Sequence, residues 1–377
     1  MSRPTILYQG LLASPASWAY VGRGLLTALI ELGADVKAIS ARGFRFDPSF
    51  RLPEGLQVVS VRDAHCAATP DVGLGFFHPP NLDRMLGHKK FNLFSWEADR
   101  VPPEWINPMR EGADFILVPS KFTRQSLVDS GLETERVVVL AHGFDPRFVD
   151  QRRPLEDGHV RFLSVAAPHW RKGVRELCQA YRAAFTCQDN VLLHIKTTYD
   201  PVHSRRTFPF EISSWNDLLV ESGLLDPLAP RVKLDVETLS DACQMEIYRQ
   251  AHVYVAPTWG ESFGLAILEA LAHGVPVIAT EWSGHVEHFC DGVDWLPYDL
   301  RPGENVLYAD APGAHVAIPD VPTLAARMRW HYEFRTASKE MGRRGQAAVS
   351  HLTWQNAARQ CMQIIGNGSF PDLSISL

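Results

Sequence analysis

Residues 260–280 read GESFGLAILEALAHGVPVIAT, and this stretch decides the fold that the sequence predicts. A loop of small residues leads into an apolar helix over 263–272, and a buried strand follows over 275–279. Gly274 is a typical residue after a helix C-terminus, and Pro276 prevents the helix from continuing. A helix followed at once by a buried strand is the repeating unit of a parallel α/β sheet.

Two carboxylates in this stretch indicate a binding site. Glu261 precedes the helix, and Glu269 lies two turns into it. The N–H groups at the helix start, from Phe263, Gly264 and Leu265, attract anions such as phosphate. Carboxylates beside an anion site suit a ligand with phosphate and hydroxyl groups, which describes a nucleotide sugar. Glutamate also favours helices and their first turns, so such a pair often arises by chance.

Length and composition indicate a soluble protein of two domains. The chain has 377 residues, which exceeds one ordinary core, and its hydrophobic content is 46%. The net charge of −6 argues against nucleic acid as a main partner. There is no signal-peptide core and no apolar run near the roughly 18 to 20 residues that span a bilayer. Six cysteines without a close Cys-x-x-Cys pair predict a reduced, cytoplasmic setting, and peripheral contact with the inner membrane face stays open.

Apolar runs alternate with helical patterns along most of the chain, as in βαβ units. In the first half, strands are predicted over 5–8, 36–39, 58–61, 91–94, 115–118 and 137–140, and helices over 21–32 and 123–130. In the second half, strands are predicted over 162–165, 191–196, 232–234, 253–256 and 275–279, and helices over 174–185, 241–250, 263–272 and 353–365. The polar segment 144–157 is the best linker candidate.

The predicted fold is α/β, with two doubly wound Rossmann-like domains that face a central cleft. The first domain is expected over residues 1–148 and the second over 158–350, followed by a helix and tail over 351–377. The carboxyl ends of both sheets then line the cleft, where ligands usually bind.

A basic segment, HWRKG at 169–173, is the second candidate feature. Arg171 and Lys172 lie at a helix N-terminus, where positive side chains oppose the helix dipole and destabilise the helix. The same positive charges favour the binding of a diphosphate. A solvated basic turn is the alternative. His169 and Lys196 are further candidates at the cleft, although a lysine at a strand end is more often simply solvated.

The loop Gly10–Gly24 and the segment SWEADR at 95–100 also follow strands at the predicted cleft. Small residues such as Gly10 let a ligand approach the backbone, but the loop lacks dinucleotide-binding spacing, and an ordinary turn is about as plausible. Glu97 or Asp99 suits an acceptor hydroxyl or a catalytic base. A metal at these acids ranks lower, because Arg171 and Lys172 can neutralise a diphosphate.

Two structural alternatives accompany these segments. For Asp99 and Arg100, the alternative is a structural salt-bridging role. A further candidate segment is SGHVE at 283–287. Its small residues Ser283 and Gly284 let the chain pass close to a nucleotide or sugar. Its histidine and glutamate suit an ordinary helix start.

Together, these motifs resemble the family-4 retaining glycosyltransferases of the GT-B fold. The sharpest part is APTWGESFGLAILEALAHGVPVIATEWSGHVE at 256–287, which is close to the family's Glu-x7-Glu segment and small-residue turn. Supporting pieces are RKG at 171–173, VPSKFTRQSLVDSG at 118–131, AHGFD at 141–145 and HLTWQNAA at 351–358. The resemblance covers nearly the whole chain and is clearer in its second half.

The resemblance implies a role for each site residue. Glu261 faces the donor sugar, and Glu269 holds the ribose hydroxyls. Phe263–Leu265 present backbone amides to the sugar and phosphates, and Lys172 neutralises the leaving diphosphate. Ser283–Gly284 take the position of paired glycines.

The resemblance also implies the reaction and its partners. A sugar moves from a nucleotide sugar bound by the second domain to a hydroxyl acceptor on the first, with retained configuration. No metal cofactor is expected, because Arg171 and Lys172 can neutralise the leaving diphosphate. Residues 351–377 cross back to the first domain. The chain departs from the family at Ala167, where an arginine is usual, and at Glu97, where many members carry histidine. A catalytically weak accessory subunit and a nucleotide-sugar epimerase remain alternatives.

Overall fold

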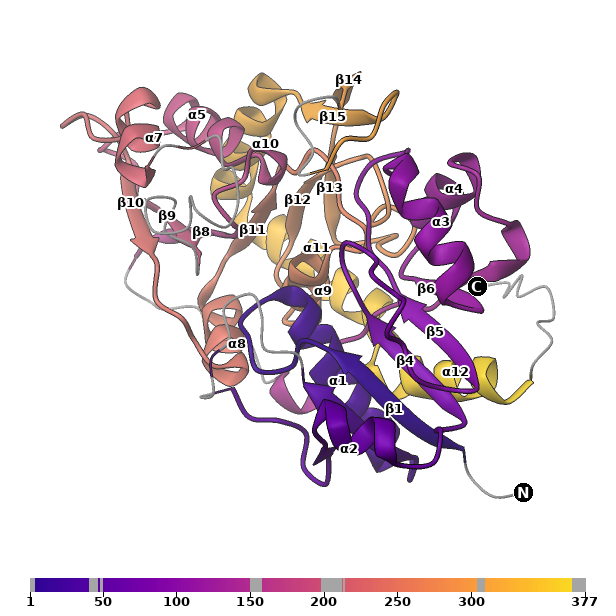
Figure 1. Ribbon diagram of the computed structural model, residues 1–377. Coiled ribbons are helices and arrows are strands. Elements are labelled where there is room, and N and C mark those ends of the chain that lie inside the picture. The colour runs from indigo at the N-terminus through magenta and orange to yellow at the C-terminus, as the bar shows by residue number, and fades with distance from the viewer. Residues whose placement is uncertain are drawn as a thin grey trace.

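The computed structural model describes residues 4–40, 47, 50–149, 158–197, 212, 214–303 and 309–367. Residues 150–157 of the predicted linker and residues 368–377 of the predicted tail lie outside this range. Two parallel sheets with flanking helices form the two halves of the molecule (Figure 1). None of the described helices is long and apolar enough to cross a membrane.

The first sheet has seven parallel strands in the order β3-β2-β1-β4-β5-β6-β7. Its strands are β1 (Thr5–Gly10), β2 (Asp35–Ser40), β3 (Gln57–Val58), β4 (Val72–Phe76), β5 (Lys89–Leu93), β6 (Phe115–Val118) and β7 (Val137–Val139). The helices between them are α1 (Ser17–Glu31), α2 (Val61–Cys66), α3 (Pro103–Gly112) and α4 (Lys121–Asp129), with short 3₁₀ turns at Thr134–Arg136 and Pro146–Phe148.

The second sheet has six parallel strands in the order β10-β9-β8-β11-β12-β13. They are β8 (Val160–Val165), β9 (Val191–Lys196), β10 (Arg231–Asp235), β11 (Val253–Ala256), β12 (Val277–Thr280) and β13 (Val293–Leu296). Its helices are α5 (Val174–Ala184), α7 (Trp215–Glu221), α8 (Asp241–Gln250), α9 (Leu265–Ala272), α10 (Val321–Glu333) and α11 (Arg335–Val349). A 3₁₀ turn at Trp170–Lys172 and an antiparallel hairpin of β14 (Tyr298–Pro302) and β15 (His315–Pro319) complete this half.

Both sheets use the same strand order, which confirms the predicted pair of doubly wound domains. In each sheet the order reverses beside the first strand, between β1 and β4 and between β8 and β11. Every residue of β4, β11 and β12 is buried, as expected for central strands covered on both faces. A ligand crevice is expected outside the carboxyl ends of such strands, at the point of reversal.

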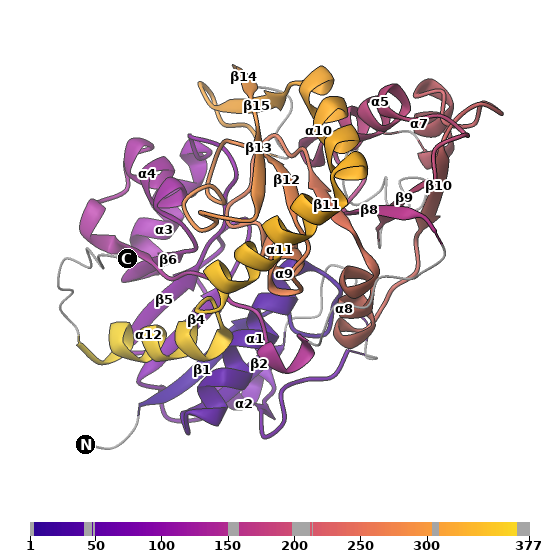
Figure 2. The ribbon, with the colours of Figure 1, turned by 180° about the vertical axis from the view of Figure 1, so that it is seen from behind.

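The helix α12 (Trp354–Asn367) follows the second domain but packs on the first, against α1 (Figure 2). Trp354 is buried there, and a Cβ atom on Gly24 of α1 would come within 2.3 Å of its ring. The chain returns beside its outgoing segment, because Phe144 N–H donates to Leu352 O at 3.0 Å and Trp354 N–H donates to Phe144 O at 3.1 Å. The helix therefore completes the core of the first domain.

Some predicted elements need correction. The predicted strand 58–61 is wrong at its end, because Ser60 caps α2 by accepting from Asp63 N–H at 3.0 Å. The helix predicted from 263 begins at Leu265, because Gly264 has φ +84 and cannot be helical. Sequence reasoning missed β4, whose two glycines hide the apolar pattern, and α3, which contains a proline at 108. It also missed α2, α7, α10, α11 and the strands β13 to β15.

Candidate functional site

A cavity of about 820 Å³ lies between the two domains. From the first domain, its lining comes from segments that follow β1, β4, β5 and β7. From the second domain, it comes from segments that follow β8, β9 and β11, together with the start of α9. The cavity is therefore at the carboxyl ends of both sheets, where the two strand orders reverse.

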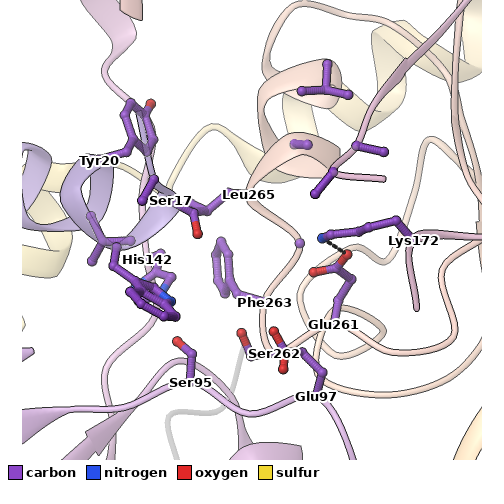
Figure 3. Close-up of a pocket in the computed structure, with 18 of the residues that line it drawn as sticks. Ser17, Tyr20, Ser95, Glu97, His142, Lys172, Glu261, Ser262, Phe263 and Leu265 are labelled. Atoms are coloured by element: carbon purple, nitrogen blue, oxygen red, sulfur yellow. Dashed lines mark hydrogen bonds and ion pairs between the residues drawn. The ribbon is translucent and has the colours of Figure 1, made fainter. Parts of the chain in front are cut away.

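Four charged side chains meet in this cavity, three of them labelled in Figure 3. Lys172 Nζ donates to Glu261 Oε1 at 2.5 Å, and Arg171 Nη1 lies 3.6 Å from the same oxygen. Arg171 Nη2 lies 3.1 Å from Oε1 of Glu97, which belongs to the first domain. All four side chains are at most 24% exposed. The structure thus brings the four predicted catalytic residues together, and Arg171 links the two domains.

Close backbone contacts fix this arrangement. Gly173 has φ +64, and a Cβ atom there would come within 1.8 Å of Pro257 O, so glycine is required. Trp259 N–H donates to Arg171 O at 2.7 Å, and Arg171 Nη1 donates to Gly260 O at 2.7 Å. The segment after β8 and the segment after β11 are therefore held against each other, and their charged side chains meet as a consequence.

Burial and pairing set the protonation of the cluster. Burial acts to raise the pKa of Glu261, but the charges of Lys172 and Arg171 outweigh it and hold that pKa below its ordinary value. Burial lowers the pKa of Lys172, against the opposing effect of Glu261. For His169, burial and then the neighbouring Arg171 and Lys172 lower the pKa to about 3. His169 is therefore a neutral ring at pH 7, and its Nδ1 accepts from Arg171 N–H at 3.2 Å.

Glu269 lines another part of the cavity, on α9, and is only 4% exposed. Burial raises its pKa to about 7, even though hydrogen bonds from Tyr248 and Tyr20 lower it. Tyr20 belongs to α1 of the first domain, whereas Tyr248 and Gln244 belong to α8 of the second. This carboxyl group is thus held by neutral hydroxyl and amide groups, in contrast to Glu261.

The start of α9 lies at the cavity wall, as the sequence predicted. Phe263, Gly264 and Leu265 all line the cavity. The Phe263 ring is buried, with its centroid 5.1 Å from that of His142. This placement brings the positive end of the α9 dipole to the same cavity as Lys172.

Ser283 and Gly284 contact this loop and are absent from the described cavity lining, and their contact with a donor stays a prediction. Ser283 Oγ accepts from Glu261 N–H at 2.8 Å, and Gly284 N–H donates to Glu261 O at 2.8 Å. A Cβ atom on Gly284 would come within 2.1 Å of Ser262 O. Their small size lets them hold the loop that carries Glu261.

The structure also shows the surroundings of Gly10 and Lys196, whose roles in donor binding stay predictions. Gly10 ends β1 away from the described lining, and a Cβ atom there would meet the Tyr8 hydroxyl at 2.6 Å. Lys196 lines the cavity, but its ammonium donates to Asp235 Oδ1 at 2.9 Å, to Thr197 O at 3.3 Å and to the carbonyl of Glu237. An ammonium has three N–H donors, so Lys196 is used within the protein.

The acidic residues after β5 separate in the structure. Asp99 pairs with His315 Nδ1 at 3.0 Å instead of with Arg100, which lies 4.0 Å from Asp129. Each of the two residues thus has a structural partner, in agreement with the structural alternative for Asp99 and Arg100. In the part of the chain that the structure describes, no cluster of three or more His, Cys, Asp or Glu side chains could hold a metal.

Sequence reasoning missed most of the lining that the first domain contributes. These residues are Trp18, Tyr20, Phe76, His78, Trp105 and His142. Trp18 and Tyr20 fall inside the predicted loop Gly10–Gly24, and Phe76 and His78 lie at the end of β4. The six residues come from four separate places along the chain, so no single local motif groups them. The only available signals are their positions after strands and, for His142, its place in the AHGFD motif.

Comparison with known proteins agrees with this geometry. Residues 159–311 match the family described as glycosyl transferases group 1. The O-antigen chain mannosyltransferase B of Escherichia coli is 24% identical over 335 residues, which cover 83% of this chain and 71% of that protein. The D-inositol 3-phosphate glycosyltransferase of Nocardia farcinica is 30% identical over 119 residues, which cover 32% of this chain and 22% of that protein.

Solved structures show the same fold over nearly the whole chain. Sucrose-phosphate synthase from Thermosynechococcus elongatus has a TM-score of 0.69 at 17% identity, covering 96% of this chain and 98% of that one. HepE of Anabaena, in complex with UDP and glucose, has a TM-score of 0.69 at 14% identity, covering 97% and 100%. At these identities the likeness shows the fold alone. The chain therefore has the GT-B architecture, and its residues 159–311 are similar to the group 1 glycosyl transferases.

Proposed function

We propose that this protein is a retaining, family-4 type glycosyltransferase that moves a sugar from a nucleoside diphosphate donor to an acceptor hydroxyl. The observation that carries the proposal is the cluster of Lys172, Arg171 and Glu261, which shares the interdomain cavity with the N-terminus of α9. Cations and a helix N-terminus form a diphosphate site, and a carboxylate beside them suits sugar hydroxyls. HepE, which shares the fold, was solved with UDP and glucose.

In this proposal the donor diphosphate lies against Lys172, Arg171 and the start of α9. Glu261 faces the donor sugar, and Glu269 accepts hydrogen bonds from the ribose hydroxyls. Negative charge grows on the diphosphate as its bond to the sugar breaks, so fixed cations stabilise the transition state more than the ground state. The leaving phosphate helps to deprotonate the acceptor on the same face, which retains the configuration. A metal is not required, because the protein supplies the cations.

The departures at Ala167 and Glu97 fit the same site. Ala167 lines the cavity but has no side chain that reaches a phosphate. Arg171 is the cation that replaces the family arginine, because His169 is neutral at pH 7. Glu97 holds Arg171 in the cavity through their 3.1 Å ion pair.

The test combines product analysis with one variant. The protein is incubated with UDP-, GDP- and ADP-sugars and an acceptor panel, and the anomeric configuration of each product is read by NMR. Lys172→Ala is expected to lower the transfer rate about a hundredfold or more. Lys339→Ala, at an exposed lysine of α11, is the matched control and should transfer normally.

Other results would contradict the proposal in distinct ways. An inverted product would exclude the retaining reaction. Isomerised donor without an acceptor would indicate an epimerase. Nucleotide binding without turnover on any acceptor would indicate an accessory role.

A further inference from the structure

The first domain presents a continuous aromatic surface to the cavity. Trp18, Phe76, His78 and Trp105 all line it. The ring centroid of Trp18 lies 4.9 Å from that of His78 and 6.3 Å from that of Phe76. The His78 and Trp105 centroids are 5.0 Å apart. We call these four residues the aromatic wall.

The aromatic wall and its surroundings are close to electrically neutral at pH 7. Burial, with a contribution from Arg171, lowers the pKa of His78 to about 3, so its ring is uncharged. Burial and then His288 lower the pKa of the neighbouring His142 to about 3 as well. Two charged residues, Arg23 and Glu97, lie in the described part of this side of the cavity. Arg23 pairs with Asp241 at 2.9 Å, and Glu97 pairs with Arg171 at 3.1 Å, so the charge of each is balanced.

Polar groups border the same surface. Ser17 and Ser95 line the cavity, and both are drawn in Figure 3 beside His142. Ser95 is buried, and Ser17 is exposed. A surface of aromatic rings bordered by a few hydroxyl groups is typical of sites for small molecules that have both apolar faces and polar edges.

We propose that the aromatic wall is the acceptor subsite and that it takes a neutral sugar ring, such as the terminal residue of a glycoside. One face of a pyranose carries several C–H groups, which pack on aromatic rings, while its hydroxyls point to the edge. Ser17, Ser95 and Glu97 then receive the hydroxyls, and the attacking one is directed toward Glu261 across the cavity. This inference rests on the proposed glycosyl transfer and names the class of acceptor for it.

The best probe residue is Trp18, because it is only partly buried and it lines the cavity. The variants are Trp18→Ala and Trp18→Phe. The matched control is Trp330→Ala, which removes a partly buried tryptophan from α10, outside the described cavity lining. Binding of methyl α-D-mannopyranoside and methyl β-D-glucopyranoside is measured by NMR titration in the presence of UDP or GDP, and nucleotide affinity is measured separately.

Trp18→Ala is expected to weaken binding of the preferred methyl glycoside about tenfold, which is the usual worth of an aromatic stacking contact. Trp18→Phe should restore most of the affinity, and Trp330→Ala should change nothing. Nucleotide affinity should be the same in all four proteins.

Two results would overturn the inference. One is equal glycoside binding by Trp18→Ala and the unaltered protein. The other is tighter binding of glucose 6-phosphate or a polyprenyl phosphate than of either methyl glycoside, which would indicate an anionic or lipid acceptor. Loss of nucleotide binding by the unaltered protein would instead contradict the proposed donor, so the two failures are distinguishable.

Discussion

The two walls of the central cavity use different chemistry. The wall from the second domain carries Lys172, Arg171 and Glu261 as close ion pairs beside a helix N-terminus. The wall from the first domain is formed mainly by aromatic rings, among them Trp18 and Trp105. A ligand that bears charge is compensated at one wall, and a ligand that bears apolar faces packs on the other. Substitutions in the second-domain wall should therefore change how charge on a ligand is stabilised. Substitutions in the first-domain wall should change how a ligand packs.

The largest effect is expected from Glu261→Gln, which breaks the charge balance of the second-domain wall. Transfer should fall about a hundredfold to a thousandfold, because the substitution removes the carboxylate that the proposed function places against the reacting sugar. Nucleoside diphosphate should bind at least as tightly as before, because Lys172 and Arg171 lose the carboxylate that neutralises them. Steady-state kinetics and calorimetry measure the two quantities, and Glu281→Gln, at an exposed position on the same domain, is the control. Weaker nucleotide binding would contradict this account.

A pH dependence is expected where the two walls meet, at Glu269 and Tyr20. Burial raises the pKa of Glu269 from 4.5 to about 7, so the folded protein holds this proton more tightly than the unfolded chain. The free energy of unfolding should therefore fall, by about 3 kcal/mol from this group, as pH rises from about 4.5 to about 7.

Glu269→Gln should remove that part of the pH dependence. Denaturant unfolding at a series of pH values measures it, with Glu333→Gln at an exposed site of α10 as the control. If the ionised carboxylate holds the ribose, nucleotide affinity should also rise with pH through about 7. Identical pH profiles for Glu269→Gln and the unaltered protein would show that this carboxyl group titrates normally.

A smaller effect is expected from the ion pair that joins the two walls. Arg23 donates to both carboxylate oxygens of Asp241, at 3.1 and 2.9 Å, and also to the carbonyls of Leu12 and Ser14. Asp241→Asn should lower the free energy of unfolding by about 2 kcal/mol, because Arg23 stays buried without its full partner. Asp299→Asn, in an exposed pair on β14, should cost much less. Equal losses would show that the Arg23 pair does not hold the domains together.

The smallest effect is expected outside the cavity, at Asp99. Its pair with His315 is 38% and 47% exposed, so Asp99→Asn should lower stability by less than about 1 kcal/mol. Transfer by this variant should match that of the unaltered protein, with or without EDTA. Loss of transfer in EDTA, restored by Mg²⁺ or Mn²⁺, would show that a metal takes part.

The second-domain wall could be predicted from sequence because its residues are close together in the chain. Glu261, Phe263 and Glu269 come from one loop and helix, and Arg171 and Lys172 come from one turn. The aromatic wall could not be predicted, because Trp18, Phe76 and Trp105 come from three separate segments that only the strand order brings together.

Other residues show what local sequence cannot reveal. The sequence alone suggests that Lys196 is a cation in the cleft. In the fold, Asp235 of the neighbouring strand β10 lies beside Lys196 and forms an ion pair with it. The small side chain of Ser283 allows close approach of a ligand or of another backbone segment equally well. The local sequence therefore cannot tell which of the two Ser283 contacts. Most strands of both sheets, in contrast, follow from apolar patterning. The exceptions are β13 and β4, and in β4 glycines replace the side chains that would have formed the pattern.

The position of α12 has a consequence for synthesis on the ribosome. The first domain builds its core with Trp354, Ala358 and Cys361, which are translated about 200 residues after that domain's last strand. At typical bacterial and eukaryotic rates of about 5 to 20 residues per second, that delay is about 10 to 40 seconds. During this time the α1 surface that receives α12 lacks its partner, so the first domain cannot complete its core until the helix emerges.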